Sequence, residues 1–402
     1  MKTYVFKTTD LGKTWKSLAN EQLKGYAHVI REDPVNSSLL FLGTESGLFV
    51  SIDGGNSWSQ FKGKLPDASV RDLVIQKQSA DLVVATHGRG IYIIDDITPL
   101  REITPSMLDS DFIYLPARPS LIRNPVQEQE FSGDDQFVGR NPSEAAVITY
   151  YLKKRHIFGD MYIEIYNDKG EKIKTLPAGK NKGINIVHWN IRKDPPKVPH
   201  SPAVLGQAIY GPTYPPGDYT VKIIKGDKTY SGKISIKFDP KIPHSVAERE
   251  IQYETLMKAY DALENLAFLD KQVMEIKDKS SKALKGLKKD LQLYNTLSDL
   301  STGMGDLHKN LVATNPSQLS GEERLREKLG DIYSAVLGYQ GKPTESQIER
   351  LKVLTTDLAN KRNIVDEILN KKIPAINDQL KNLKVEPIKI ITREEFDKSS
   401  KD

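Results

Sequence analysis

The sequence contains no cysteine and no long apolar run, and its charges nearly balance. Among its 402 residues, 58 Lys or Arg face 53 Asp or Glu, which leaves a formal net charge of only +5. The absence of cysteine excludes disulfides, thiolate metal sites and cysteine nucleophiles. No stretch reaches the roughly 18 apolar residues of a membrane-spanning helix. A weak and mixed charge gives no reason to expect nucleic acid as a partner.

Motifs for catalysis and for cofactors are also missing. The seven histidines are scattered and show no HExxH or comparable ligand spacing. Neither a GxSxG nucleophile motif nor a Walker phosphate loop occurs. We therefore expect no metal and no cofactor, and the sequence leaves open whether the protein is an enzyme. Met1–Lys7 lacks the apolar core of a signal peptide and instead indicates a strand that enters a turn.

Composition and periodicity divide the chain into segments. Residues 1–104 alternate like short strands between Gly and Asp turns, and a Pro-rich stretch, expected to be a linker, covers 105–143. Strand-like alternation returns over 144–239 and ends at Pro240 and Pro243. Residues 245–385 have helical periodicity, with capping boxes beginning at Ser245 and Thr344, and 386–402 form a C-terminal tail.

The first segment contains a repeated octet, which is the most specific signal in the sequence. Its two copies end in Trp15 and Trp58, 43 residues apart, which is the length of one blade of a β-propeller. In each copy the Asp can accept backbone N–H groups across a hairpin turn, the Gly can adopt positive φ, and the Trp is expected to be buried between sheets. The repeated positions are Thr8, Asp10, Gly12, Thr14 and Trp15, and Ser51, Asp53, Gly55, Ser57 and Trp58.

The octet Ser/Thr-x-Asp-x-Gly-x-Thr/Ser-Trp resembles the Asp-box, or BNR, repeat of sialidases, GH74-type xyloglucanases and sortilin propellers. The chain as a whole resembles the C-terminal part of bacterial BNR-repeat glycosyl hydrolase or sortilin-like proteins. This resemblance implies that each box joins two strands on the rim of a blade, away from the central funnel. Asp10 and Asp53 then have a structural role and are not catalytic. It also implies a periplasmic, cell-surface or secreted location.

Only about two and a half blades fit into residues 1–104, whereas a propeller closes with typically four to eight. Open sheet edges of this kind are prone to aggregation. We therefore expect the remaining blades to come from the same parent protein or from a separate chain, as the main partner of this one.

The second β segment is expected to be a small sandwich. Its order of strands and turns, including Met161–Tyr166, His188-Trp189 and Pro215–Tyr219, resembles an Ig-like domain of the FlgD type. Such a domain is either a module that binds protein or glycan or a rigid spacer. The helical segment is expected to be an antiparallel bundle of about four helices. The predicted fold class is thus multidomain: partial propeller, sandwich and bundle.

Outside the octets, His87 and Arg89 are the one candidate for a ligand site. The turn His87–Gly90 offers a cation and backbone N–H groups to an anion, although a simple turn between strands is the favoured interpretation. We therefore predict a non-catalytic interaction or scaffold protein outside the cytoplasm. One alternative is the C-terminal portion of a glycoside hydrolase whose active site lies upstream. A second is a sortilin-like domain that binds peptides.

Overall fold

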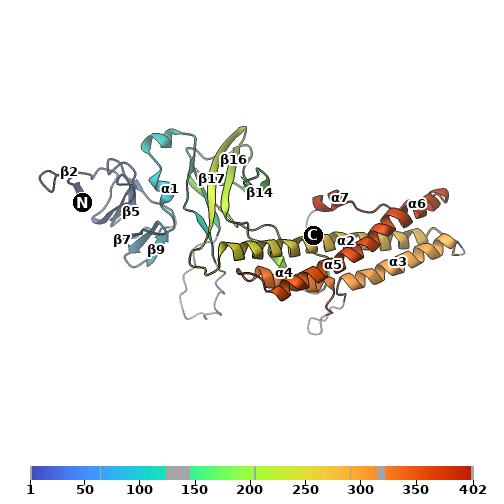
Figure 1. Cartoon of the computed structure of the whole chain (residues 1–402). Coiled ribbons are helices and arrows are strands. Elements are labelled where there is room, and N and C mark those ends of the chain that lie inside the picture. The colour runs from blue at the N-terminus through green and yellow to red at the C-terminus, as the bar shows by residue number, and fades with distance from the viewer. Residues whose placement is uncertain are drawn as a thin grey trace. The chain divides into compact units, whose positions relative to one another are not determined.

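The computed structural model describes residues 2–63, 65–123, 145–202, 205–289, 291–314 and 322–399 (Figure 1). The chain divides into two compact units. The first consists of Met1–Ile191 and Pro215–Pro240 and holds the described strands, and the second consists of Arg192–Tyr214 and Lys241–Asp402 and holds the long helices. The expected order, β structure followed by a helical region, is confirmed.

Three small antiparallel sheets follow one another at the start of the first unit. Their strands are ordered as they occur in the sequence, so each sheet is a simple meander. The first sheet has β1 (Phe6–Lys7) and β2 (Lys16–Ser17); the second has β3 (Ala27–Glu32), β4 (Leu40–Thr44), β5 (Gly47–Ser51) and β6 (Ser59–Gln60); the third has β7 (Val70–Gln76), β8 (Asp81–Thr86) and β9 (Ile91–Ile94).

The second sheet is covered on both faces. Because neighbouring residues of a strand point to opposite faces, Leu40 and Leu42 of β4 lie on one side and Phe41 on the other. Leu40 and Leu42 pack in a cluster with Val5 and Leu18, which directly flank β1 and β2, and with Trp58 of the second octet. Phe41 packs in a second cluster, which includes Leu73, Leu82 and Val84 of the third sheet. The three sheets are therefore stacked face to face.

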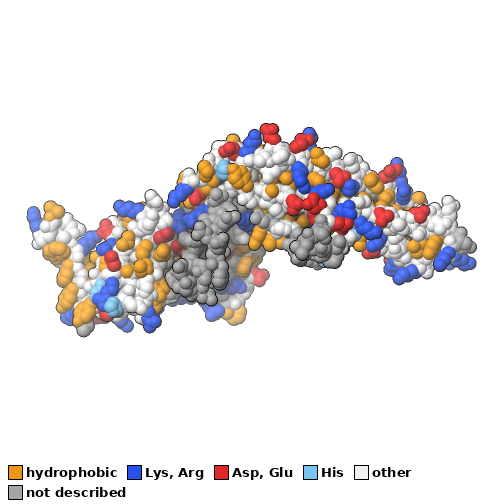
Figure 2. Space-filling view, turned by 90° about the horizontal axis from the view of Figure 1, so that it is seen from below, with side chains coloured by type: hydrophobic (Ala, Val, Ile, Leu, Met, Phe, Trp, Pro, Cys, Tyr) orange, Lys and Arg blue, Asp and Glu red, His pale blue; other side chains and the backbone are white. Residues whose placement is uncertain are grey.

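The two ends of this stack are open. On the third sheet, Val74 pairs with Val83 and Val83 with Ile93, so these residues share one face. That face leaves Val74, Ile91 and Ile93 52%, 71% and 60% exposed. At the other end Trp15 is 61% exposed, which corrects the expectation that both tryptophans are buried. Figure 2 shows hydrophobic side chains at the surface of the N-terminal end of the chain.

Two larger sheets form the rest of the first unit. Short helical segments α1 (Thr98–Arg101) and η1 (Pro105–Asp109) lead into them. Trp189 of one sheet lies against Tyr219 of the other with ring centroids 5.3 Å apart, so the sheets face each other. The three-stranded sheet has the order β10 (Phe112–Leu115), β12 (Ala146–Leu152), β15 (Gly183–Trp189); the five-stranded sheet has β11 (Ser120–Ile122), β17 (Lys228–Phe238), β16 (Gly217–Lys225), β13 (Met161–Tyr166), β14 (Lys172–Pro177).

The expected domain boundaries need correction at two places. β10 pairs with β12 and β11 with β17, so part of the expected linker 105–143 belongs to these sheets. The reason is that Phe112, Ile113 and Leu115 are buried, which an exposed linker does not permit. Residues 192–214, expected within the sandwich, belong to the second unit. Residues 124–144, which include most of the expected linker and the expected start of the sandwich, lie outside the described residues.

The second unit is built from long helices around one apolar core. The capping boxes predicted at Ser245 and Thr344 are present, and α2 and α5 begin directly after them. None of the described helices combines the length and the apolar character that crossing a membrane requires. The elements are α2 (Val246–Leu284), α3 (Gln292–Leu311), α4 (Leu325–Leu337), α5 (Glu345–Glu367), the π-helical turn η3 (Ile368–Lys372), α6 (Ile373–Asn382) and α7 (Arg393–Lys398).

The segment 192–214 is tied to α4. The Tyr333 hydroxyl donates to the Tyr210 carbonyl at 2.6 Å, and Nε of the buried Arg326 donates to the Pro199 carbonyl at 2.8 Å. Leu205, which precedes the short helix η2 (Gly206–Ile209), packs where a Cβ on Gly330 would approach to 2.5 Å. Glycine at this position of α4 therefore lets the segment lie directly on the helix.

Gly43→Ala tests the stacking of the second and third sheets. A Cβ on Gly43 would lie 2.7 Å from Cγ1 of both Val29 and Val70, so the first strands of the two sheets would have to separate. We expect the substitution to lower the free energy of unfolding by about 1–3 kcal/mol, as overpacking does. Gly303→Ala is the control, because its Cβ meets nothing within 4 Å and helix propensity favours Ala. Urea unfolding of the full chain measures both; equal midpoints for the two variants would contradict the expectation.

Candidate functional site

The two octets form turns that are closed by their aspartates. Asp10 Oδ1 accepts hydrogen bonds from the Thr14 backbone N–H at 2.9 Å and from the Thr8 hydroxyl at 2.8 Å. Asp10 Oδ2 accepts from the Thr14 hydroxyl at 2.6 Å. Both oxygens of the carboxylate are therefore engaged within the turn, and the role of Asp10 there is structural.

Asp53 repeats this arrangement in the second octet. Its Oδ1 accepts from Ser57 N–H at 2.9 Å and from the Ser51 hydroxyl at 2.7 Å, and its Oδ2 accepts from the Ser57 hydroxyl at 2.5 Å. Gly12 and Gly55 have φ of +87° and +91°, the left-handed region in which glycine is favoured. The hydroxyl, Asp, Gly and hydroxyl positions of the octet thus have the same local role in both copies.

The tryptophans that end the octets differ in their surroundings. Trp58 is 2% exposed, and its indole N–H donates to the Leu18 carbonyl of the preceding segment at 2.9 Å. The indole N–H of Trp15 instead donates to Gly12 of its own octet at 3.1 Å. The octet fixes its own turn, but the burial of its tryptophan depends on the sheet before it.

Hydrogen bonding lowers the pKa of both aspartates. The bonds from the Thr14 side chain and backbone and from Thr8 lower the pKa of Asp10 to about 2. At Asp53, burial raises the pKa, but the bonds from Ser57 and Ser51 outweigh it, and the net shift is downward. Each bond is made to the charged form, so the folded state favours ionised carboxylates. Neither aspartate is suited to donate a proton near neutral pH.

His87 and Arg89 lie in the exposed turn between β8 and β9, as the sequence predicts. The turn is closed by Thr86, whose backbone N–H and hydroxyl both donate to the Gly90 carbonyl, at 3.1 and 2.6 Å. Gly88 and Gly90 have positive φ, which accounts for the two glycines. The structure gives no contact that joins His87 to Arg89, so it does not bring them together as a binding site.

The structure does bring together a polar cluster that the sequence analysis missed. Glu45, in the turn between β4 and β5, accepts from the His28 ring at 2.7 Å and from the Ser69 hydroxyl at 3.2 Å. The Arg71 guanidinium lies 3.5 Å from the same carboxylate and 3.4 Å from Nδ1 of His28. A guanidinium can only donate, so Nδ1 accepts and Nε2 carries the proton that His28 donates to Glu45.

This cluster joins the first strands of the second and third sheets, because His28 lies on β3 and Arg71 on β7. The ion pair of Arg31 with Asp72, at 3.0 Å, joins the same two strands. The hydrogen bond from His28 lowers the pKa of Glu45, against the effect of burial and with help from Ser69 and Arg71. Glu45 is therefore an ionised acceptor. No spacing in the sequence marks these residues, since they come from three separate elements.

The backbone N–H of His87 donates to the carbonyl of Ser69 at 2.8 Å. The turn that the sequence singled out therefore lies beside the cluster around Glu45. What this region can do chemically is to present two guanidinium groups at the surface, that of Arg71, which is paired with Glu45, and that of the exposed Arg89.

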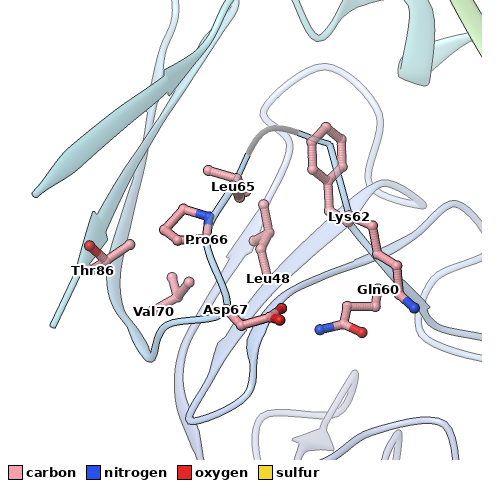
Figure 3. A pocket seen from close by; sticks show the side chains of 10 residues that line it. Leu48, Gln60, Lys62, Leu65, Pro66, Asp67, Val70 and Thr86 are labelled. Atoms are coloured by element: carbon pink, nitrogen blue, oxygen red, sulfur yellow. The ribbon is translucent and has the colours of Figure 1, made fainter. Parts of the chain in front are cut away.

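A cavity of about 540 Å³ lies between the second and third sheets (Figure 3). Leu48 and Val70 form part of its wall, and Figure 3 shows the Asp67 carboxylate and the Gln60 amide facing each other across it. Among the described lining residues Asp67 is the one carboxylate, and there is no histidine. The described lining of the cavity therefore contains no pair of carboxylates of the kind that glycoside hydrolysis uses.

No family model matches the chain, and no curated protein matches it. Among solved structures, CopC from Methylosinus trichosporium OB3b aligns at 15% identity over 25% of this chain and 84% of its own, with a TM-score of 0.16. A Salmonella alpha-2-macroglobulin mutant aligns at 13% identity over 50% of this chain and 12% of its own, with a TM-score of 0.19.

The Niastella koreensis GH74 enzyme aligns at 14% identity over 58% of this chain and 42% of its own, with a TM-score of 0.21. All three are weak structural neighbours of this chain.

Asp53→Asn tests the role of the octet carboxylate through pH. Because the folded state lowers the pKa of Asp53 below 3.8, its charge stabilises the fold fully above that pH, and this contribution is lost as pH falls through the lower folded-state value. We expect the variant to be less stable at pH 7 by about 1 kcal/mol, with the difference shrinking toward pH 2. Urea unfolding followed by the summed emission of the three tryptophans measures it. Asp227→Asn, in the exposed β16–β17 turn, is the control; a constant difference at all pH values would contradict the assignment.

Proposed function

We propose that the chain is a non-catalytic interaction or scaffold protein whose first three sheets are blades of an Asp-box β-propeller, completed by further blades. In this proposal the two larger sheets are an Ig-like sandwich, and the helical unit is a separate module. The octets resemble those of sialidase and sortilin propellers, and on that resemblance the protein works outside the cytoplasm of a bacterium, in the periplasm or at the cell surface.

The observation that carries the proposal is the difference between Trp58 and Trp15. Both end the same octet, and both octets have the same internal hydrogen bonds. Trp58 is buried because the segment after the first octet lies over it and Leu18 accepts its N–H. By the equivalence of the repeats, a preceding blade would cover Trp15 in the same way. The exposed rings of Tyr4, Phe6 and Trp15 would then be covered by that preceding blade.

The opposite end of the stack supports the same conclusion. The open face of the third sheet carries Val74, Ile91 and Ile93, on the side away from the cluster that it shares with the second sheet. In the second sheet both faces are covered by neighbouring sheets. Exposed apolar sheet faces of this kind mark interaction sites. A blade on each side would give the outer sheets the same environment as the second one.

Two of the described carboxylates at the first strands, Glu45 and Asp72, do not favour glycoside hydrolysis. That reaction needs two carboxyl groups about 5–10 Å apart, one of them a general acid with a raised pKa. Glu45 has a lowered pKa and is held by His28, and Asp72 is paired with Arg31. In a propeller the first strands line the funnel. We therefore infer that Glu45 and Asp72 link the two sheets and hold arginines at their surface. They are not the pair of carboxyl groups that would cleave a glycoside.

Hydroxyl-radical footprinting of Trp15 tests the proposal. The protein is purified under native conditions from its source and compared with the recombinant chain of residues 1–402. We expect Trp15 to be oxidised several-fold more slowly in the native assembly, because a further blade covers it. Trp58 is the internal control for a buried indole and Tyr339 for an exposed ring, and both should react equally in the two samples.

Equal oxidation of Trp15 in both samples would contradict the proposal, because the octet would then end in an uncovered indole in the working protein. Mass spectrometry of the same native sample then shows whether the protecting blades are part of the same polypeptide or of a separate one.

A further inference from the structure

Two adjacent apolar side chains protrude from the loop that joins β12 to β13. They are Ile157 and Phe158, which are 68% and 85% exposed. The loop belongs to neither the octets nor the polar cluster around Glu45, and it lies within one unit of the structure. An inference about it therefore stands independently of the propeller.

Hydrogen bonds on either side of Ile157 and Phe158 fix the loop. The backbone N–H of His156 donates to the Lys180 carbonyl at 2.9 Å. The His156 ring lies 3.3 Å from the Gly159 carbonyl, and since a carbonyl only accepts, Nε2 carries the proton of this bond. Gly159 has a φ of +86°, which lets the chain turn back. The two apolar residues are therefore held between anchored neighbours and face the solvent.

Two further loops lie at the same end of these sheets. One precedes Gly183, which pairs with Leu152, the last residue of β12. The other is the turn between β16 and β17, and it follows Lys225, which pairs with Met161, the first residue of β13. Both are therefore neighbours of the loop 153–160.

Hydrogen bonds also join the three loops to one another. The Gly226 backbone N–H donates to the Asp160 carbonyl at 2.9 Å, and the Lys180 ammonium donates to the Gly159 carbonyl at 3.4 Å. The loops therefore form one continuous surface. We call it the loop surface, and it consists of residues 153–160, 178–182 and 225–228.

The loop surface is rich in cations that have no carboxylate partner. Lys153 is the exception, because it pairs with Asp109 at 3.2 Å. Six other basic side chains form no ion pair with any residue that the structure describes; they are Lys154, Arg155, Lys180, Lys182, Lys225 and Lys228. Three further carboxylates lie at this end of the sheets, those of Asp111, Asp160 and Asp227. The unpaired cations therefore outnumber them two to one.

This combination fits an anionic lipid bilayer better than it fits a folded protein. The apolar part of a stable protein interface belongs to a patch of about 800 Å² on each partner. Here it consists of two side chains that stand out from charged neighbours. Protruding apolar side chains can enter the acyl layer of a membrane, while lysines and arginines around them meet the phosphate groups of the lipids.

We propose that the loop surface binds peripherally to a membrane that contains anionic phospholipid, with Ile157 and Phe158 inserted at the boundary between headgroups and acyl chains. The six unpaired cations then lie at the level of the headgroups. Two signals are combined, because a small apolar anchor alone holds a protein at a membrane only weakly. This attachment to one face of a bilayer requires no membrane-spanning helix.

Vesicle flotation with the full chain tests the proposal. One set of vesicles consists of phosphatidylcholine, and in the other about a third of the lipid is phosphatidylglycerol, which is anionic. We expect the chain to bind the anionic vesicles at least about tenfold more tightly, with the difference falling as salt is added.

Insertion can be measured directly, because the chain has no cysteine that would compete for a label. Ile157→Cys carries the environment-sensitive dye acrylodan in the full chain. We expect its emission to shift to shorter wavelength on anionic vesicles, as the dye enters the acyl layer. Ile209→Cys, labelled in the same way at a residue that is 62% exposed in the second unit, is the control and should show no shift.

A pair of double variants tests the apolar contribution. Ile157→Ser with Phe158→Ser is expected to weaken binding to anionic vesicles about tenfold or more. Ile209→Ser with Tyr210→Ser is the matched control, because it removes another exposed isoleucine and its neighbouring aromatic ring, and it should leave binding unchanged. Circular dichroism confirms that both variants are folded.

A second pair tests the cations. Lys182→Glu with Lys228→Glu changes two loops that do not carry the apolar pair, and it is expected to weaken binding about tenfold or more. Lys169→Glu with Lys237→Glu makes an equal change of charge at exposed lysines near the opposite end of the same strands, and it should have no effect.

Equal binding to neutral and anionic vesicles, an unshifted emission of labelled Ile157→Cys, or equal effects of both members of a variant pair would overturn the proposal. Single-stranded DNA is the last probe, and binding of DNA without binding of vesicles would overturn it in favour of a nucleic acid. None of these outcomes bears on Trp15, so failure here is distinct from failure of the proposed propeller.

Discussion

The stacking of small sheets is the constraint on which the N-terminal part of this protein depends. A meander of two to four short strands with apolar residues on both faces gains stability only if both faces are covered. Gly55 makes the stacking possible at one point, since a Cβ there would approach Leu18 to 2.7 Å, and Leu18 accepts the indole N–H of Trp58. The second octet therefore forms a turn and, through Gly55 and Trp58, also contacts the segment around Leu18.

The polar features of the same region follow from this stacking. β3 and β7 are joined by polar contacts, including the ion pair of Arg31 with Asp72. Beside them, Glu45 contacts His28, Ser69 and Arg71, which come from separate elements. These contacts fix how the second and third sheets approach each other, and they hold cations at the surface. The helical unit is organised differently. There one core is shared by long helices, and the segment 192–214 is held on α4 by Tyr333 and Arg326.

Local signals in the sequence predicted local structure well. The octets predicted hairpin turns closed by Asp10 and Asp53, and the capping boxes predicted the starts of α2 and α5. Each of these depends on residues within four positions of one another, so a short window of sequence contains the whole interaction. Predictions from the sequence were wrong where a residue's contacts come from a segment far away along the chain. It expected Trp15 to be buried, and it treated 105–143 as a linker although Phe112–Leu115 pairs with a strand that begins at Ala146.

The sequence by itself determined the order of the protein, with β structure before helices, the repeat of 43 residues and the chemistry of each turn. Only the tertiary structure decided which tryptophan is covered and which residues meet around Glu45. The physical reason is that hydrogen bonds within a turn are fixed by neighbours along the chain. Burial and charge pairing are instead fixed by whichever segment the fold places alongside.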